Sequence, residues 1–269
     1  MADEYSLNGK VAIITGSGRE NGIGAGIAYA FARHGASVVI NYVSDSSAAR
    51  ANKVAENVRG LGGKAAVIQG SITSRPGAKH IIQSAMTQFN VSSIDILGQW
   101  LSSVVNNAGG PAKTHGSIMD YKPQDLLNDF ELNYFGAIYM IQEAVPHMNR
   151  GGRIINIGAM SSITYVPGMP IYSAAKAALD HTTKSLAVEL GKKSGITVNV
   201  VAPGLTMTDQ PLNLDEDLRT TVMGLAAEKS SAANRVGTIE DVADVTLFVA
   251  SEKSRWITGH VFPVGGGMY

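Results

Sequence analysis

Short apolar runs recur along the chain without strict alternation, and longer segments with mixed, helix-like patterns separate them. A strand that is buried on both faces of a parallel sheet has such a continuous apolar run. Strands that alternate with helices are typical of right-handed βαβ crossovers and therefore of a parallel sheet. We expect strands over residues 10–15, 37–42, 64–69, 153–157, 197–202 and 260–264, with one more strand near residue 105.

Helix-like patterns fill the segments between these strands. We expect helices over residues 25–34, 46–61, 76–89, 123–148, 172–191 and 239–251. Residues 94–105 are too long for one strand, so either the strand covers only residues 102–106 or the turn before it is enlarged. Residues 205–231 are polar and mixed, and such a long irregular segment is often a substrate lid. No linker, repeat or low-complexity segment interrupts the chain, so we expect a single domain over residues 1–269.

The composition excludes several classes of function. The 269 residues are 45% hydrophobic and 16% charged, with a formal net charge of +0, and they include no cysteine. This balance gives no sign of a nucleic-acid partner, and disulfide or thiolate chemistry is excluded. The scattered histidines lack the spacing of a zinc site. No apolar run approaches the roughly 18 residues of a membrane span, and the first residues do not resemble a secretory signal. We therefore expect a cytoplasmic enzyme with no metal and no membrane partner.

A glycine-rich turn follows the first expected strand. Gly16, Gly22 and Gly24 lie between that strand and the helix expected over residues 25–34. Glycines let the backbone approach a pyrophosphate, and a helix N-terminus offers free N–H groups and the positive end of the helix dipole. A strand, a glycine-rich turn and a helix in this order predict a dinucleotide site.

Tyr172 and Lys176 lie four residues apart at the start of an alanine-rich helix, so both occupy one helix face. A phenol has an ordinary pKa of about 10, and a nearby ammonium lowers that pKa because it favours the phenolate. The pair therefore predicts a proton donor or acceptor. Taken alone, the same spacing is also that of two residues on a solvated helix face.

In their joint order, these motifs resemble the short-chain dehydrogenase/reductase family, and the resemblance covers nearly the whole chain. The matching residues are 7–11 (LNGKV), Thr15 and Gly16 with 22–24 (GIG), 106–109 (NNAG), Asn133, Tyr172 with Lys176, Asn199 with Pro203 and Gly204, and Arg235 and Gly237 before Glu240 and Asp241. The resemblance implies a Rossmann-type, doubly wound, seven-stranded parallel sheet in the order 3-2-1-4-5-6-7. It also implies a nicotinamide dinucleotide at the carboxyl ends of the strands and a homo-oligomer, either a tetramer or a dimer.

The resemblance also implies roles by position. Tyr172 would exchange a proton with the substrate oxygen, and Lys176 would hold the nicotinamide ribose and keep the tyrosine pKa low. Asn133 would kink its helix and help to order a water that relays protons to Lys176. The hydroxyls of Thr206 and Thr208 could instead cap their own loop. The implied cofactor-binding residues are Gly16, Arg19, Gly22, Ile23, Gly24, Asn41, Tyr42, Ser44, Ser71, Ile72, Asn107, Ala108, Gly109, Tyr172, Lys176, Pro203, Gly204, Thr206 and Thr208.

The chain departs from the family pattern at four places outside the chemistry. Five residues separate Gly16 from Gly22, where the family usually has three. Ser71 stands where an aspartate often meets the adenine, and the fourth strand has a lengthened approach. Gly265 replaces the aspartate of the C-terminal Val-Asp-Gly-Gly motif.

A fifth departure concerns the chemistry. The family serine, which donates a hydrogen bond to the substrate carbonyl, lies thirteen positions before the tyrosine, and Ala159 occupies this position. A methyl group cannot donate, and the loss of one such donor costs on the order of 10²–10³ in turnover. Three interpretations follow: Ser161 substitutes, the substrate needs no serine, or the chain is an engineered variant. Ser161 and Ser162 could also simply cap their turn. We expect Ala159, Ser161 and Met207 of the lid beside the substrate.

Two functions are consistent with these residues. The first is an NADPH-dependent reductase of a ketone, quinone or polyphenol-type carbonyl, since the run Val-Val-Ile-Asn-Tyr at residues 38–42 resembles the NADPH-using carbonyl and naphthol reductases of the family. The second is a cofactor-binding protein with altered chemistry, such as an isomerase, a cyclase or a regulator, for which Ala159 would be the mark.

The expected cofactor is NADP(H). Strand two ends in Asn41, where NAD-preferring members carry a carboxylate for the adenine ribose. The guanidinium of Arg19 suits a 2′-phosphate, and the hydroxyls of Ser44 and Ser46 could add donors. Asp45 would favour NAD if its loop turned inward.

Overall fold

A computed structural model describes residues 4–90, 100–110, 117–209 and 215–268. Its strands form one parallel sheet in the order β3-β2-β1-β4-β5-β6-β7, which confirms the expected doubly wound topology. The strands are β1 (Lys10–Ile14), β2 (Ser37–Tyr42), β3 (Lys64–Gln69), β4 (Trp100–Asn106), β5 (Met148–Ile157), β6 (Thr197–Pro203) and β7 (Val261–Val264). The strand near residue 105 therefore begins before residue 102, and residues 94–99 lie outside the described residues.

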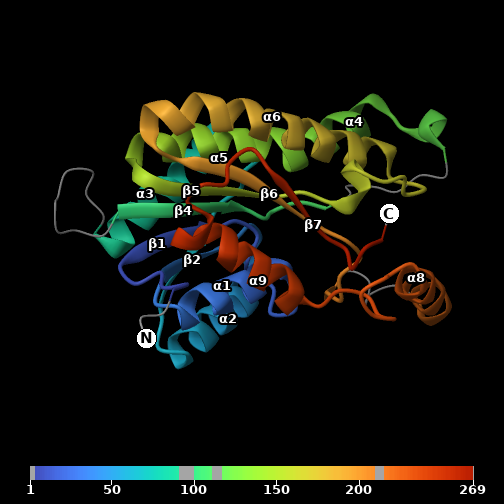
Figure 1. The fold of residues 1–269 in the computed structure, drawn as a ribbon, viewed down its shortest axis with the longest axis horizontal. Coiled ribbons are helices and arrows are strands. Elements are labelled where there is room, and N and C mark those ends of the chain that lie inside the picture. Colours follow the sequence, from blue (N-terminus) through green and yellow to red (C-terminus); the bar gives the residue numbers. More distant parts are fainter. Residues whose placement is uncertain (1–3, 91–99, 111–116, 210–214, 269) are drawn as a thin grey trace.

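Helices cover both faces of the sheet (Figure 1). One layer contains α1 (Ile23–Arg33), α2 (Ala48–Gly60) and α9 (Ile239–Ala250), and the other contains α3 (Arg75–Phe89), α4 (Pro123–Phe130), α5 (Gly136–Ala144) and α6 (Pro170–Ser194). Helix α8 (Glu216–Glu228) lies to the side of these layers. No helix in the described ranges is apolar over a length that would span a bilayer.

Two apolar cores, one on each face, explain the continuous apolar runs. Neighbouring residues of a strand point to opposite faces of the sheet. Ile14 and Val38 accordingly pack under α1, α2 and α9, whereas Ile13 and Val39 pack under α3, α5 and α6. Since both faces are covered by helices, the central positions of these strands, residues 11–14 and 38–40, are all apolar.

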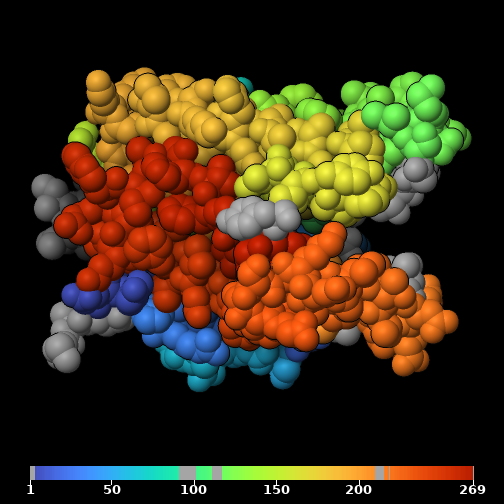
Figure 2. Space-filling model, turned by 45° about the vertical axis from the view of Figure 1, so that its right-hand side comes forward, coloured from blue at the N-terminus to red at the C-terminus, as the bar shows by residue number. Residues whose placement is uncertain are grey.

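Two expected elements differ from the structure. The helix expected over residues 123–148 is divided, because the π-helix Glu131–Phe135 separates α4 from α5 and Met148 already belongs to β5. The segment 205–231, expected to be irregular, contains the 13-residue helix α8. The space-filling view places α8, in orange, below the yellow residues that follow β5, and residues 210–214 lie outside the described residues (Figure 2).

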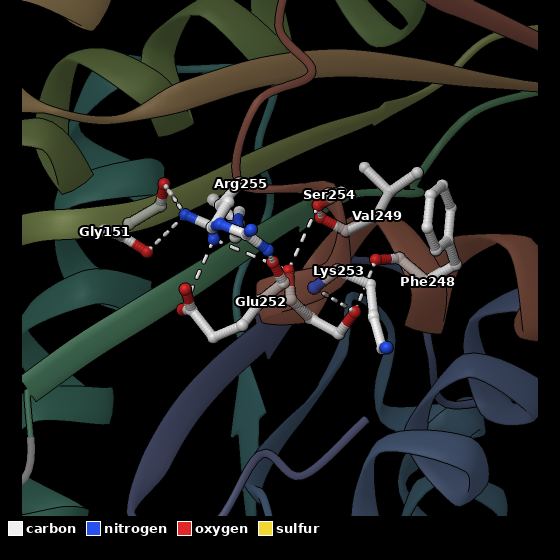
Figure 3. Close-up of polar contacts among 10 residues, drawn as sticks. Gly151, Phe248, Val249, Glu252, Lys253, Ser254 and Arg255 are labelled. Atoms are coloured by element: carbon white, nitrogen blue, oxygen red, sulfur yellow. Dashed lines mark hydrogen bonds and ion pairs between the residues drawn. The ribbon is translucent and has the colours of Figure 1, made fainter. Parts of the chain in front are cut away.

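A buried arginine fastens the end of α9 to the start of β5. Arg153 is 3% exposed, and its Nη1 donates to the carbonyl of Gly151 at 2.6 Å. Its Nη2 donates to the carbonyl of Ser251 at 3.4 Å and to Oε1 of Glu252 at 3.3 Å. These contacts lie beside the start of the short 3-10 helix Glu252–Ser254, which follows α9 (Figure 3). Burial lowers the pKa of Arg153, and the Glu252 carboxylate opposes this effect.

Candidate active site

Thr15 joins the glycine turn to the end of β4. Its Oγ1 accepts the N–H groups of Asn107 and Ala108, each at 3.0 Å. In return, Nδ2 of Asn107 donates to the carbonyls of Thr15 at 2.8 Å and Gly16 at 3.2 Å. Gly16 has a φ of +63°, and a Cβ there would lie 2.8 Å from Cα of Ala108, so only glycine fits this approach. The ends of β1 and β4 are therefore fixed against each other.

The first turn of α1 fits a dinucleotide pyrophosphate. Its N-cap residue is Gly22, which has no side chain that could cap the first N–H groups. A Cβ at Gly24 would lie 2.5 Å from Nδ2 of Asn107, so the turn packs closely on the end of β4. Ile23 begins the helix at this point. Free backbone donors at the positive end of a helix dipole are what a phosphate needs.

The lengthened glycine turn contacts the start of the expected lid. The N–H of Asp209 donates to the carbonyl of Asn21 at 3.2 Å. The Asp209 carboxylate pairs with Arg50 of α2 and accepts a further bond from the Asn21 side chain. These bonds, with the charges of Arg50 and Arg19, hold the pKa of Asp209 below its ordinary value. The residues between Gly16 and Gly22 thus provide a support for the segment after β6.

The structure revises the expected role of Asn41, because its side chain is wholly buried. Its Oδ1 accepts from the N–H of Gly16 at 3.0 Å, and its Nδ2 donates to the carbonyls of Ile68 at 3.2 Å and Gly70 at 3.0 Å. Asn41 therefore supports the glycine turn from inside. Ile72 is likewise only 2% exposed and packs in the core, where a Cβ at Gly136 would lie 2.6 Å from its Cδ1.

The remaining residues expected at the adenosine end lie at the surface of the cleft. Arg19 and Ser44 are exposed, and Tyr42 is half-buried. The hydroxyl of Ser44 lies 2.9 Å from those of Ser46 and Ser47. Ser71, after β3, is half-buried, and its hydroxyl lies 2.9 Å from that of Thr73.

Tyr172 and Lys176 share one face of α6, as expected. Lys176 is 3% exposed, and its Nζ lies 5.8 Å from the centre of the Tyr172 ring. The same Nζ donates to the carbonyl of Ile157 at 2.8 Å, and burial lowers the pKa of Lys176 to about 8. The expectation of a lowered tyrosine pKa is wrong for the protein alone. Burial, followed by the Asp129 carboxylate, raises the pKa of Tyr172 to about 12, because a buried phenolate loses its hydration.

Asn133 lies in the π-helix between α4 and α5 and is 1% exposed. Its side chain pairs with the backbone of Gly110, accepting from the N–H at 2.9 Å and donating to the carbonyl at 3.0 Å. A Cβ at Gly109 would lie 2.8 Å from Oδ1 of Asn133 and 3.1 Å from Nζ of Lys176. Glycine at position 109 therefore lets the end of β4 approach both side chains.

Ala159, at the family serine position, is buried and offers no donor. Ser161 follows in the short helix Met160–Ser162, and its Oγ is buried without a hydrogen-bond partner among the described residues. Ser161 lines a cavity of about 300 Å³ between Ser117, the loop at residues 164–166 and the first turn of α6. Ser173, in that turn, lines the same cavity with a second unpartnered hydroxyl.

The segment after β6 is fastened to its surroundings by the backbone. The hydroxyl of Thr206 donates to the carbonyl of Gly204 at 3.0 Å, which is the self-capping alternative. Met207 is 37% exposed, and its N–H donates to the carbonyl of Gly237 at 2.8 Å. Thr208 is half-buried, and Pro203, the last residue of β6, is buried. Met207 does not line the cavity beside Ser161.

Gly265, one of the departures from the family pattern, packs against the residue that follows Ala159. A Cβ at Gly265 would lie 3.0 Å from Cγ of Met160. A Cβ at Gly204 would lie 2.9 Å from Cα of Gly265. Met160, next to Ala159, therefore occupies space that a side chain at position 265 would need.

A row of buried, hydrogen-bonded side chains beneath the site was not predicted from the sequence. Nδ2 of Asn106 donates to Oδ1 of Asn156 at 2.8 Å, and Nδ2 of Asn156 donates to Thr183 at 2.9 Å. This chain joins β4, β5 and α6. Asn106 and Asn156 interrupt two apolar runs and face each other in register, which is the signal that could have revealed them.

Known proteins resemble this chain in sequence and in fold. A family profile described as enoyl-(acyl carrier protein) reductase matches residues 16–269. The chain is 37% identical to the short-chain dehydrogenase/reductase FrzI of a Cladobotryum species, over 98% of this chain and 97% of the relative. It is 35% identical to versicolorin reductase stcU of Emericella nidulans, over 100% of this chain and 98% of the relative. The structure of angucycline C-6 ketoreductase LanV with bound NADP matches with a TM-score of 0.85 and 29% identity. The match covers 98% of this chain and 96% of the ketoreductase. The chain therefore belongs to the short-chain dehydrogenase/reductase family of nicotinamide-dependent oxidoreductases.

Proposed function

We propose that the protein reduces a ketone, quinone or polyphenol-type carbonyl with NADPH, and that Tyr172 delivers the proton to the carbonyl oxygen. The observation that carries this proposal is the convergence of Lys176 and Asn133 on Gly109, beside the glycine turn and within reach of the Tyr172 ring. A bound reduced nicotinamide would supply a hydride to the carbonyl carbon. The names of the versicolorin reductase and the ketoreductase support the direction of reduction.

The charge states of the two side chains support proton donation by Tyr172. A phenol with a pKa of about 12 holds its proton at neutral pH and is therefore ready to give it to an oxygen that gains negative charge. The Lys176 ammonium lies over the ring and would stabilise the phenolate that remains. Asn133 holds the backbone of Gly110 in place, and we retain the proposal that it orders a relay water.

Ser161 is proposed to orient the substrate carbonyl in place of the serine that Ala159 replaces. Its hydroxyl is buried, has no bond to any described residue and lines the cavity at the first turn of α6. A buried donor without a partner is costly to the fold, so a ligand that accepts from it would recover this energy.

The preference for NADPH over NADH rests on the charges near β2. Asn41 places no carboxylate in the cleft, and the exposed Arg19 can meet a 2′-phosphate. Asp45, the residue that would favour NADH, accepts a hydrogen bond from Nε2 of Gln69 at 2.8 Å. The ketoreductase with bound NADP is consistent with this preference.

The decisive experiment measures NADPH oxidation with a panel of aryl ketones, quinones and hydroxylated naphthalenones. We expect turnover by the unmodified protein and almost none by Tyr172→Phe, with the affinity for NADPH little changed, because the phenol acts in the transition state. Tyr29→Phe is the matched control, since that hydroxyl contacts Asn57 away from the site. Full activity of Tyr172→Phe would refute the reductase mechanism.

A second candidate function is a cofactor-binding protein with isomerase, cyclase or regulatory chemistry. Ala159 is the observation that favours it, because a reductase of this family normally keeps the donor at that position. Tight NADPH binding by calorimetry, together with no oxidation of NADPH by any carbonyl in the panel, would support this alternative.

We also propose that residues 205–231 form a lid over the substrate.

We propose that the protein forms a homo-oligomer, either a dimer or a tetramer. Helix α4 buries Asp125 and Asp129 but exposes Leu127, and Phe135 and Val188 are exposed on the neighbouring helices. Exposed apolar side chains on adjacent elements are typical of an interface. Light scattering of the unmodified protein and of Val188→Glu tests it, and a monomer in both cases would refute it.

A further inference from the structure

A buried carboxyl group lies behind the turn that carries Ser161. Asp180 is on α6, one helical turn after Lys176, and is 9% exposed. Its Oδ2 lies 2.6 Å from Oγ of Ser162, and the same Oγ lies 2.7 Å from the carbonyl oxygen of Ala159. A single serine hydroxyl therefore joins the carboxyl group on α6 to the residue at the family serine position.

The number of protons shared by Asp180, Ser162 and the carbonyl of Ala159 decides whether the Asp180 carboxyl group is charged. Both distances are those of good O–H···O hydrogen bonds. A serine hydroxyl has one proton, whereas an ionised carboxylate and a carbonyl can only accept. Ser162 cannot donate to both, so an ionised Asp180 would leave two acceptors facing each other at bonding distance. A proton on the carboxyl group completes the chain: Asp180 donates to Ser162, and Ser162 donates to the carbonyl of Ala159.

The surroundings of the second carboxyl oxygen agree with a neutral acid. Oδ1 is buried and has no hydrogen-bond partner among the described residues. It faces Gly158, where a Cβ would lie 3.1 Å from Oδ1 and would also meet the side chains of Val200 and Ala202 on β6. An ionised oxygen in such an apolar setting would be strongly penalised.

We propose that Asp180 is a neutral carboxylic acid in the folded protein and that the chain from Asp180 through Ser162 to Ala159 positions the turn that presents Ser161. The proposed positioning of Ser161 rests on the reductase function proposed above, whereas the proposed charge state of Asp180 does not. The charged groups that face Asp180 are Lys176 and Lys184, both on α6, while β5, β6 and the turn present Gly158, Val200, Ala202 and Ser162. Burial raises the pKa of Asp180, and the hydrogen bond with Ser162 and the attraction of both lysines oppose this effect.

The carboxamide of asparagine copies a protonated carboxyl group, so one substitution separates the two charge states. Asp180→Asn should keep the melting temperature and kcat, because its NH₂ group donates to Ser162 as the acid does. Asp180→Ala and Ser162→Ala should lower kcat at least tenfold with little change in KM for NADPH, because the turn loses its anchor. Thr246→Ala is the control: it removes a buried hydroxyl from α9 and should lower stability without this loss of kcat.

Two readouts test the charge directly. The infrared spectrum of the unmodified protein at neutral pH should contain a carboxylic-acid carbonyl band that Asp180→Asn lacks. The pH profile of kcat should coincide in the two proteins, since each would have an uncharged group at position 180 beside Lys176. Absence of the band, or a loss of kcat in Asp180→Asn as large as in Asp180→Ala, would overturn the proposal. If the unmodified protein oxidises no NADPH, the reductase function fails, and the infrared band still decides the charge.

Discussion

Lys176 donates from Nζ to the carbonyl of Ile157 at 2.8 Å and so holds α6 against the end of β5. The bond fixes a buried charge 5.8 Å from the Tyr172 ring, where no solvent screens it. A buried ammonium is unfavourable in itself, which is why its pKa falls from 10.5 to about 8. Folding is therefore less favourable by the free energy of burying this charge, which the proposed mechanism uses.

This cost has opposite effects on stability and activity. Between pH 8 and 10.5 the unfolded chain keeps the lysine proton and the folded protein loses it, so stability should rise with pH in this window. Over the same range kcat should fall, because the ammonium over Tyr172 is lost. Melting temperatures of the unmodified protein and of Lys176→Met between pH 7 and 10 test this prediction. Parallel curves would contradict it, since Lys176→Met has no charge to lose.

The donor at the carbonyl can be located by exchanging hydroxyls. Ser161→Ala should lower turnover at least tenfold if Ser161 orients the substrate, because a lost donor of this kind costs on the order of 10²–10³. Ala159→Ser should keep or raise turnover. Ser173→Ala is the comparison, since it removes the other unpartnered hydroxyl from the same cavity and should cost less. If steady-state rates are alike in all three variants, the carbonyl is activated in another way.

Arg19 should set the choice of cofactor. We expect kcat/KM to favour NADPH over NADH at least tenfold, which corresponds to about 1.4 kcal/mol. Arg19→Ala should reduce this ratio by weakening NADPH more than NADH, because the guanidinium meets the 2′-phosphate. Asp45→Asn is the control and should leave the ratio unchanged while Gln69 holds that side chain. Equal use of both cofactors by the unmodified protein would point to Asp45 instead.

Arg153 and Glu252 should contribute very unequally to stability, although they form one ion pair. Arg153→Met removes the donor of the half-buried Gly151 carbonyl and of the buried carbonyls of Gly152 and Ser251. It should lower the free energy of unfolding by about 2–6 kcal/mol, since each of the two buried acceptors left unpaired costs about 1–3 kcal/mol. Glu252→Gln should cost under about 1 kcal/mol, because its carboxylate is 63% exposed. Urea denaturation measures both, and equal losses would show that the charge pair matters more than the carbonyl bonds.

The strands could be predicted because helices on both faces favour apolar residues at neighbouring strand positions, as Ile13 and Ile14 illustrate. The early end of the helix expected over residues 123–148 has a visible cause in Pro146, which cannot continue a helix. The π-helix around Asn133 left no trace in the apolar period. The same is true of helix α8, whose polar and mixed residues gave no clean helical period.

The site was harder to predict where a polar side chain serves the protein itself. Sequence reasoning identified Tyr172 and Lys176 as a pair, yet it could not foresee that burial raises the tyrosine pKa. Asn41 looked like a cleft residue because it ends a strand, and nothing in its neighbours reveals that three elements use its amide. Asp180 has no sequence pattern that distinguishes it from other charged helix residues, and only the fold brings its carboxyl group to 2.6 Å from the Ser162 hydroxyl.

Because Met160 packs against Gly265, two stretches that are distant in the sequence constrain each other's residues. A chimera that receives a relative's C-terminal segment, with aspartate at position 265, would push against the Met160 side chain and disturb Ala159 beside it. A chimera that exchanges both stretches together would meet no such conflict. The side chain at position 160 and the glycine at position 265 are thus coupled by packing, so a swap between relatives has to move both stretches together.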